Sequence, residues 1–503
     1  MQIRNMLNCG EQRILLDGIK ERHFRNIFIY IFPKFISFGL NLVALPILTR
    51  VLSPEDFGVI TLSMAVPMIT VGVVTLGLTH SVPRYYFEYR NDTEKLKSFY
   101  FTIQTYLFLV LIISSVIIYF VKDFLSLIVT QKNEYGTAIL ISYITTYVGS
   151  INMIYLRIYQ NMEKAIFYAT SVSLQTITNI IMSLIFVWYF RMTYMGILYG
   201  LLCGAALSCL IMFIKFNKES YASFNFKMLN ENMKYGLQVV PKTFSGLINR
   251  YFDKYLLNST LSMSVVGVYN IGQTITNAVD VMMSNVWMSF QPLVYKTVFD
   301  QENNAADEIG RLFTIFSYIT FIPVMLLILF SKEILHIIAP PAYYGAENVM
   351  IILAIGIASQ SFGMYVSVQY AYSKKPFWIF PATVVGSLAN IGLNILLIPK
   401  YGLIGASFAA MFSTTIINII LTAIGQKLYR IIYEWRAIIA LYSLLIIAAS
   451  FMMLFDSNSN LFVFYSIKLL LIFLFIYIGI KIKILTKQLI SKMLRFQKPG
   501  FSS

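Results

Sequence analysis

Long apolar runs recur along almost the whole chain, and they restrict its possible folds more than any other feature. Of the 503 residues, 58% are hydrophobic and only 12% are charged. Soluble domains carry about 25% charged residues, so a chain with this few could not cover a water-facing surface. A bilayer admits only helices or closed barrels, and these runs lack the period-two alternation of barrel strands. The sequence therefore predicts an all-α integral membrane protein.

Apolar runs of about 20 residues match the thickness of a bilayer core. Counting them predicts about fourteen transmembrane helices. These lie near residues 27–49, 57–79, 99–121, 136–156, 167–190, 194–214, 235–257, 265–290, 313–331, 346–371, 377–398, 403–424, 436–455 and 461–480.

The distribution of basic residues predicts the orientation. With both termini in the cytoplasm, the large majority of the 39 Lys and Arg residues fall in cytoplasmic loops, as the positive-inside rule requires. This bias explains the net charge of +16 without a nucleic-acid partner, because no Lys/Arg-rich domain is large enough to bind a duplex. Cys9, Cys203 and Cys209 form no metal or redox motif, so we expect no metal and no cofactor.

The chain repeats itself at a nearly constant offset. The pattern P-K-x-x-S-x-x-x-N occurs at Pro33–Asn41 and again at Pro241–Asn249, 208 residues later. Leu52-Ser53 recurs as Leu261-Ser262, 209 residues later. A repeat of six helices inserts both copies in the same direction, which predicts two six-helix bundles in a pseudo-twofold arrangement plus a C-terminal helix pair. Transporters of this plan place the solute path between the bundles and work by alternating access.

The predicted organisation follows from the spans and the repeat. We expect a cytoplasmic N-terminal segment (1–26), a first six-helix bundle (27–216), a cytoplasmic linker (217–234), a second six-helix bundle (235–424), a C-terminal transmembrane pair (425–482) and a basic cytoplasmic tail (483–503).

Three motifs suggest a family. The segment Leu45–Gly58, LPILTRVLSPEDFG, closely resembles the first hairpin of the polysaccharide-biosynthesis flippases. These are the Wzx-type transporters of lipid-linked oligosaccharides such as O-antigen units, within the multidrug/oligosaccharidyl-lipid/polysaccharide (MOP) superfamily, which includes the MATE exporters. Ser81–Tyr85 and Tyr401–Ala406 resemble two later turns of the same family.

The resemblance implies a function, a location and partners. It implies a transporter, and no enzyme, that flips an undecaprenyl-diphosphate-linked oligosaccharide from the inner to the outer leaflet of a bacterial cytoplasmic membrane. The oligosaccharide would be an O-antigen, capsule or exopolysaccharide repeat unit. Membrane lipids, a polysaccharide polymerase and chain-length machinery would be the partners, and H⁺ and Na⁺ are the candidate coupling ions.

Two related activities stay open as alternatives. One is a flippase for lipid-linked peptidoglycan precursor, although those relatives carry an Arg-Asp pair where this chain has Pro33-Lys34. The other is a cation-coupled multidrug exporter, although such relatives usually have twelve spans. A membrane enzyme is disfavoured because the loops hold no D-x-D motif and no Gly-rich phosphate cradle.

Charged residues inside spans cost about 2.5–3.5 kcal/mol each at a helix centre and are therefore functional candidates. Lys242, Asn249, Arg250 and Asp253 follow helical spacing, so we expect them to share a face that binds a diphosphate or an acidic sugar. Lys34, at the repeat position equivalent to Lys242, is expected to approach the same anion. The alternatives are a buried ion pair of Asp253 with a neighbouring base and snorkelling of both lysines to the headgroups.

Arg84 lies at the predicted cytoplasmic mouth of the second span and could capture the anion first. Asp253 and Asp280 are the candidate ion-coupling carboxylates, because a carboxylate near bases can change its charge state during a cycle. Lys468, in the last span, is expected to face an apolar groove beside the final pair.

Polar residues recur on one face of residues 265–290 at spacings of 3, 4, 3 and 4. They are Asn270, Gln273, Asn277, Asp280 and Ser284. Shorter stripes are Ser171, Gln175 and Thr178, and Ser387, Asn390 and Asn394. We expect the long stripe to line a lumen and bind sugar hydroxyls. Interhelical packing is the alternative, since small polar residues also join membrane helices.

Overall fold

The computed structural model describes residues 29, 32–33, 36–217, 223–237, 240–300, 305–455 and 461–482, without the side chains at 80, 83, 240–249, 299, 300, 305 and 376. Within these ranges every regular element is a helix and no strand occurs. Ten of the described helices are long and apolar enough to cross a membrane. The prediction of an all-α, multi-pass membrane protein is confirmed.

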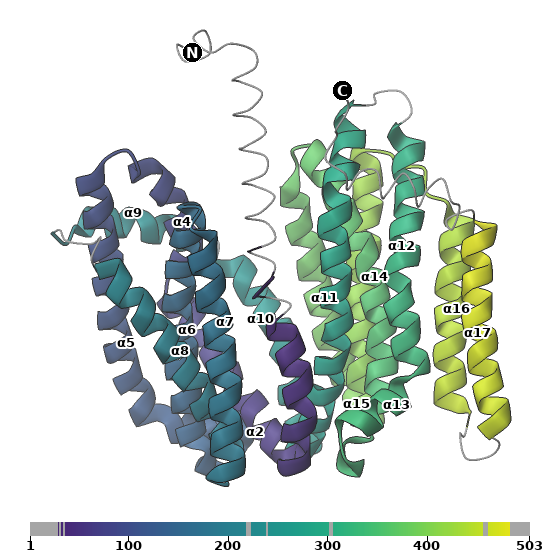
Figure 1. Ribbon diagram of the computed structural model, residues 1–503, viewed down its shortest axis with the longest axis horizontal. Coiled ribbons are helices and arrows are strands. Elements are labelled where there is room, and N and C mark those ends of the chain that lie inside the picture. Colours follow the sequence, from purple (N-terminus) through teal and green to yellow (C-terminus); the bar gives the residue numbers. More distant parts are fainter. Residues whose placement is uncertain are drawn as a thin grey trace. The chain divides into compact units, whose positions relative to one another are not determined.

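The described residues form two compact units, divided between Tyr251 and Phe252. Each unit is by itself a bundle of helices (Figure 1). Unit 1 contains an apolar helix at Ile36–Val51, then α2 (Pro54–Ser63), α3 (Ala65–Val74), α4 (Leu78–Tyr89), α5 (Thr93–Thr130), α6 (Gly136–Asn161), α7 (Ala165–Leu184), α8 (Tyr194–Asn217) and α9 (Phe226–Leu237). Helix α10 (Val240–Thr260) contains the division.

Unit 2 continues from α10 with α11 (Met263–Asp300), α12 (Ala305–Leu329), α13 (Ser331–Ile338), α14 (Ala346–Tyr372), α15 (Ile379–Leu428), α16 (Trp435–Leu454) and α17 (Leu461–Lys481). Helix starts repeat at the offset found in the sequence. Helices α2 and α11 begin 209 residues apart, and α6 and α14 begin 210 residues apart.

Helix α15 folds back on itself, although its helical assignment is continuous. Gly402 has φ 56° and ψ −127°, outside the helical region. The Asn390 side chain donates a hydrogen bond to Ser413 Oγ at 3.0 Å. A straight helix would separate residues 23 positions apart by about 35 Å. The segment is therefore a helical hairpin, where the sequence predicted two spans (377–398 and 403–424).

The number of spans stays a prediction. Six of the 23 residues of the expected span at 27–49 lie outside the described residues, and the described helix there, Ile36–Val51, is too short to be among the ten. The expected spans at 235–257 and 265–290 correspond to α10 and α11, which are helices but are not among the ten apolar ones. Polar residues lower their hydropathy, as they would in helices that line an aqueous path.

The family-like motif at residues 45–58 has a local structural role. Ser53 is the N-cap of α2, and its hydroxyl accepts from the backbone N–H of Asp56 while the Asp56 carboxylate accepts from the N–H of Ser53 at 2.9 Å. This reciprocal capping box satisfies two backbone donors at the helix start. Lys132 then ties Glu55 of the same turn to the α5–α6 connection through a 3.1 Å ion pair. The motif thus fixes a helix entry point.

Candidate functional site

Five polar residues follow one face of α11, and we call them the α11 stripe. They are Asn270, Gln273, Asn277, Asp280 and Ser284, and all are at least partly exposed. The opposite face, including Ile275 and Val279, is buried in unit 2. The stripe therefore points away from the core of its own unit. Chemically, it offers amide, hydroxyl and carboxylate groups over about four helical turns.

One carboxylate oxygen of Asp280 has no hydrogen-bond donor. Its Oδ1 atom is shielded from solvent and accepts no hydrogen bond. A shielded carboxylate oxygen without a donor is costly to maintain, and such groups are often functional. The arrangement leaves Asp280 available to bind a proton or a cation.

Asp253, the other coupling candidate, lies in different surroundings. It is only 3% exposed and sits beside Lys254 and the Tyr269 hydroxyl. The Tyr269 hydroxyl forms no hydrogen bond with the carboxylate. The carboxylate Oδ1 accepts a hydrogen bond from the backbone N–H of Lys254 at 2.8 Å, and an ion pair of Asp253 with a neighbouring base stays a prediction. Arg250, by contrast, is exposed. The two side chains were predicted to share a helix face, but one is exposed and the other is buried.

Three predicted anion contacts lie outside what the structure describes. Lys34 is not among the described residues, and the side chains of Lys242 and Asn249 are not described. Their backbone at 242 and 249 is helical, within α10. Their roles stay predictions.

Arg84 is exposed on α4 and is backed by aromatic rings. Its guanidinium lies 4.5 Å from the ring centre of Tyr235 and 5.5 Å from that of Tyr85. Burial, followed by the Glu88 and Glu231 carboxylates, raises the pKa of nearby Tyr89 to about 12, so this phenol stays neutral. A stacked guanidinium keeps its N–H groups free at the edge, where they can bind phosphate oxygens. The sequence motif around Arg84 gave no sign of Tyr235, which is distant in the chain.

The two shorter polar stripes join helices. In unit 1, Asn152 Nδ2 donates to Gln175 at 2.8 Å and to Ser208 at 2.9 Å, which links α6 to α7 and α8. In unit 2, Asn390 is bonded to Ser413 and to Asn394 at 3.0 Å each. These contacts agree with the packing alternative.

Lys468 corrects an expectation. It does not face an apolar groove, because it is 1% exposed and its Nζ lies 2.6 Å from Glu333 Oε1. The Phe464 ring centre lies 4.4 Å from the same nitrogen. A buried ammonium needs such a partner, so the pair fastens α17 to the start of α13.

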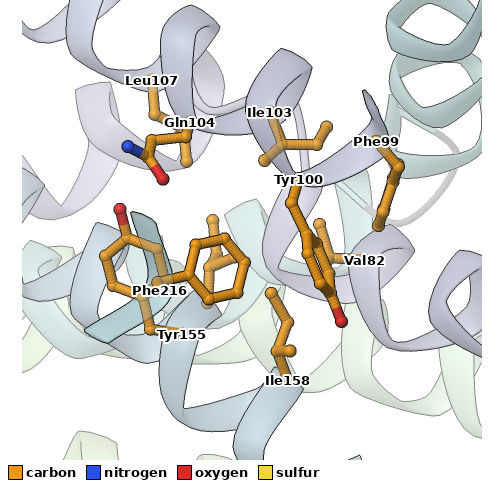
Figure 2. Close-up of a pocket in the computed structure, with 10 residues that line it drawn as sticks. Val82, Phe99, Tyr100, Ile103, Gln104, Leu107, Tyr155, Ile158 and Phe216 are labelled. Carbon is orange, nitrogen blue, oxygen red and sulfur yellow. The ribbon is translucent and has the colours of Figure 1, made fainter. Parts of the chain in front are cut away.

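Figure 2 shows a small cavity in unit 1, among α4, α5, α6 and α8. Its volume of about 10 Å³ is near the minimum for one water molecule. The lining is mainly apolar, with the Gln104 amide and the Tyr155 hydroxyl on one side. It is too small for a sugar and belongs to the core. Among the described residues, no group of three His, Cys, Asp or Glu could hold a metal ion.

Comparisons with known proteins agree with this architecture. Residues 23–298 match the family described as polysaccharide biosynthesis protein. A probable low-salt glycan biosynthesis flippase, Agl15 of Haloferax volcanii, is 25% identical over 228 residues, which cover 43% of this chain and 46% of that protein. The chain thus matches less than half the length of this curated relative.

Two solved structures share the fold. One is the lipid II flippase MurJ in an inward closed conformation, with a TM-score of 0.71, 16% identity, and coverage of 90% of this chain and 98% of that chain. The other is an inward-facing multidrug resistance MATE family transporter of the MOP superfamily, with a TM-score of 0.61, 14% identity, and coverage of 78% and 93%. At these identities the likeness establishes the fold alone.

Proposed function

Because the chain belongs to the polysaccharide biosynthesis protein family, we propose that it flips a lipid-linked oligosaccharide across a membrane. The cargo is an oligosaccharide on undecaprenyl diphosphate, such as an O-antigen, capsule or exopolysaccharide unit. It moves from the inner to the outer leaflet of the cytoplasmic membrane by alternating access of two six-helix bundles. The relative from Haloferax volcanii, a probable glycan biosynthesis flippase, supports the cargo class.

The α11 stripe is the observation that carries the proposal. It is polar over about four turns, partly exposed, and turned away from the unit 2 core. Sugar hydroxyls both donate and accept hydrogen bonds. Side-chain amides such as those of Asn270, Gln273 and Asn277 also donate through the NH₂ group and accept through the carbonyl oxygen. A packing role would leave these groups bonded to a neighbouring helix, as Asn152 and Asn390 are.

Basic residues would bind the diphosphate of the cargo. Arg84 and Arg250 are exposed, and Arg84 is preoriented by its aromatic neighbours. In our proposal Arg84 captures the diphosphate, while Lys34, Lys242, Asn249 and Arg250 hold it during transfer. Asp280 exchanges a proton or Na⁺ as the transporter changes state, and Asp253 has a structural role beside Lys254.

The proposal predicts which lipid accumulates when the protein is lost. Deleting the gene in the source organism should cause an undecaprenyl-diphosphate oligosaccharide to accumulate in the inner leaflet, with loss of the surface glycan. Extraction and mass spectrometry of lipid-linked saccharides measure this. Accumulation of lipid-linked peptidoglycan precursor, or a normal surface glycan with altered drug tolerance, would overturn the cargo assignment.

Complementing the deletion strain with single variants distinguishes residues that contact the diphosphate from residues that do not. Lys242→Ala and Arg250→Ala should restore less surface glycan than Lys375→Ala, which removes an exposed lysine in the α14–α15 connection. Lys468 is unsuitable as this control because its loss would leave the partly buried Glu333 carboxylate without its ion-pair partner. Equal restoration by the three variants would refute the charge argument.

A further inference from the structure

Helix α9 has an outer face that combines apolar and basic side chains. Its exposed residues are Phe226, Lys227, Asn230, Lys234 and Leu237, and we call them the α9 outer face. Their spacing of 1, 3, 4 and 3 keeps them on one side of the helix. The buried residues, Met228, Leu229, Asn232 and Gly236, lie on the other side. In unit 1, α9 runs across the neighbouring helices and contacts α4 and α5 (Figure 1).

Contacts along α9 fix its rotation. At its start, the backbone N–H of Asn225 donates to Thr102 Oγ1 on α5 at 2.9 Å. In its middle, the Tyr85 hydroxyl of α4 donates to the carbonyl oxygen of Glu231 at 3.3 Å. Because these bonds hold one side of α9 on unit 1, the α9 outer face must point away from it.

The end of α9 rests directly on the turn between α3 and α4. A Cβ atom at Gly236 would lie 2.2 Å from the Leu76 carbonyl oxygen, and one at Gly77 would lie 2.3 Å from the Gly236 carbonyl oxygen. Only two glycines permit this backbone-to-backbone approach. Any force on α9 is therefore transmitted to the α3–α4 turn.

The composition of the outer face identifies what covers it. Phe226 is 72% exposed and Leu237 is 47% exposed, although α9 is not one of the ten apolar helices. Phenylalanine and leucine beside lysines are typical of helices that lie in the membrane interface. The apolar side chains enter the acyl boundary there, while the ammonium groups meet lipid phosphates.

The charges around α9 favour an anionic surface. Lys227 and Lys234 lie on the outer face, and four further basic side chains are exposed at the neighbouring α4 and α5, namely Arg84, Arg90, Lys95 and Lys97. The nearby acidic side chains are Glu88, Asp92, Glu94 and Glu231, and Asp92 is paired with Lys95 at 2.9 Å. We propose that the α9 outer face binds anionic phospholipid headgroups and so anchors the α3–α4 turn to the leaflet surface.

A fluorescence experiment on the full-length protein tests this proposal. A polarity-sensitive dye is attached at Asn230→Cys in a variant without Cys9, Cys203 and Cys209. The protein is reconstituted in phosphatidylcholine vesicles with or without phosphatidylglycerol. Quenching by brominated acyl chains reports lipid contact, and quenching by iodide reports water contact. We expect lipid quenching to rise about twofold when phosphatidylglycerol is present, since each basic side chain adds attraction to an anionic leaflet.

Matched variants separate charge from apolar contact. Lys227→Gln with Lys234→Gln should abolish the increase that phosphatidylglycerol causes. Lys374→Gln with Lys375→Gln removes the same charge from exposed positions in unit 2 and should leave the increase intact. Phe226→Ser should lower lipid quenching in both mixtures. The proposal is overturned by equal quenching in the two lipid mixtures, by quenching with iodide alone, or by a dye shielded from both quenchers, which would indicate that the α9 outer face packs against protein.

Discussion

Residues 54–89 of unit 1 and helix α11 of unit 2 occupy equivalent places in the repeat but fold differently. In unit 1 the segment is divided into α2, α3 and α4, whereas α11 is one helix of 38 residues. Pro67 lies in the first turn of α3, where a proline ends the preceding helix. Leu76 and Gly77 have φ values of +51° and +70° and divide α3 from α4. Thr276 and Val286, the equivalents of Pro67 and Gly77, permit a continuous helix.

The same comparison shows that the α11 stripe has no polar counterpart at its central positions in unit 1. At an offset of 209, Gln273, Asn277 and Asp280 correspond to Met64, Met68 and Val71. The outer stripe positions correspond to Thr61 and Thr75, whose hydroxyls bond only to their own helix. Both units build a helical bundle around this segment, so packing does not require polar residues in its middle. The stripe is a property of one repeat, which favours a functional role.

The break in unit 1 should be the feature most sensitive to mutation. Gly77→Ala places a Cβ 2.3 Å from the Gly236 oxygen at a left-handed φ. The conformation alone costs about 1–2 kcal/mol and the clash adds more, so we expect a loss of about 3 kcal/mol or more. Thermal unfolding of the purified protein measures it. Gly149→Ala, where nothing lies within 4 Å of the added atom, is the control. A stable Gly77→Ala protein would mean that unit 1 can form a straight helix here.

Replacing Asp280 tests whether the stripe is functional. Asp280→Asn keeps the shape of the side chain and removes its charge, and it should reduce flipping about tenfold, equivalent to about 1.4 kcal/mol. Thermal stability should not fall, because Oδ1 has no hydrogen bond to lose. Surface glycan per folded protein in the complemented deletion strain measures the effect. Asp307→Asn, an exposed carboxylate in the first turn of α12, serves as the control. Unchanged flipping with Asp280→Asn would exclude Asp280 from coupling.

Features that depend on local sequence could be predicted. Helices followed from the apolar runs, and the helix start at Pro54 follows from the neighbouring Ser53 and Asp56, which bond within one turn. The repeat offset was visible as well, because insertion in the same direction preserves helix spacing. A pair of prolines adds to the evidence for the repeat, since Pro83 and Pro292 also lie 209 residues apart.

Features that depend on distant partners could not be predicted. Whether a polar stripe is a lumen wall or a packing contact depends on what faces it, and Asn152 and its acceptor Ser208 are 56 residues apart. Lys468 was expected in an apolar groove because its partner, Glu333, is 135 residues away in sequence. Helical spacing alone contains no information on such pairings.

Asparagines that form interhelical hydrogen bonds show how much stability such bonds contribute, and the α11 stripe residues can be compared with them. Asn152→Ala removes two interhelical hydrogen bonds and Asn418→Ala removes one, to Ser359 at 3.1 Å. Such bonds contribute about 0.6 kcal/mol on average in membrane proteins, so we expect losses of about 1 and about 0.6 kcal/mol. Asn277→Ala, an exposed stripe position, should leave unfolding unchanged and lower flipping. The distinction between the stripe and the packing contacts fails if Asn277→Ala destabilises as much as Asn152→Ala.

The smallest expected effect compares equivalent helix caps. Ser53 and Ser262 are 209 residues apart and precede α2 and α11, but only Ser53 forms a reciprocal capping box. The backbone N–H of Val265 donates to Ser262 Oγ at 3.4 Å, which is long for a hydrogen bond. Ser53→Ala should therefore cost about 1 kcal/mol, and Ser262→Ala only a few tenths. Ser53→Gly retains most cap preference and should cost less than Ser53→Ala. Equal losses from both alanine variants would show that the two repeats begin these helices alike and that they diverge only after the first turn.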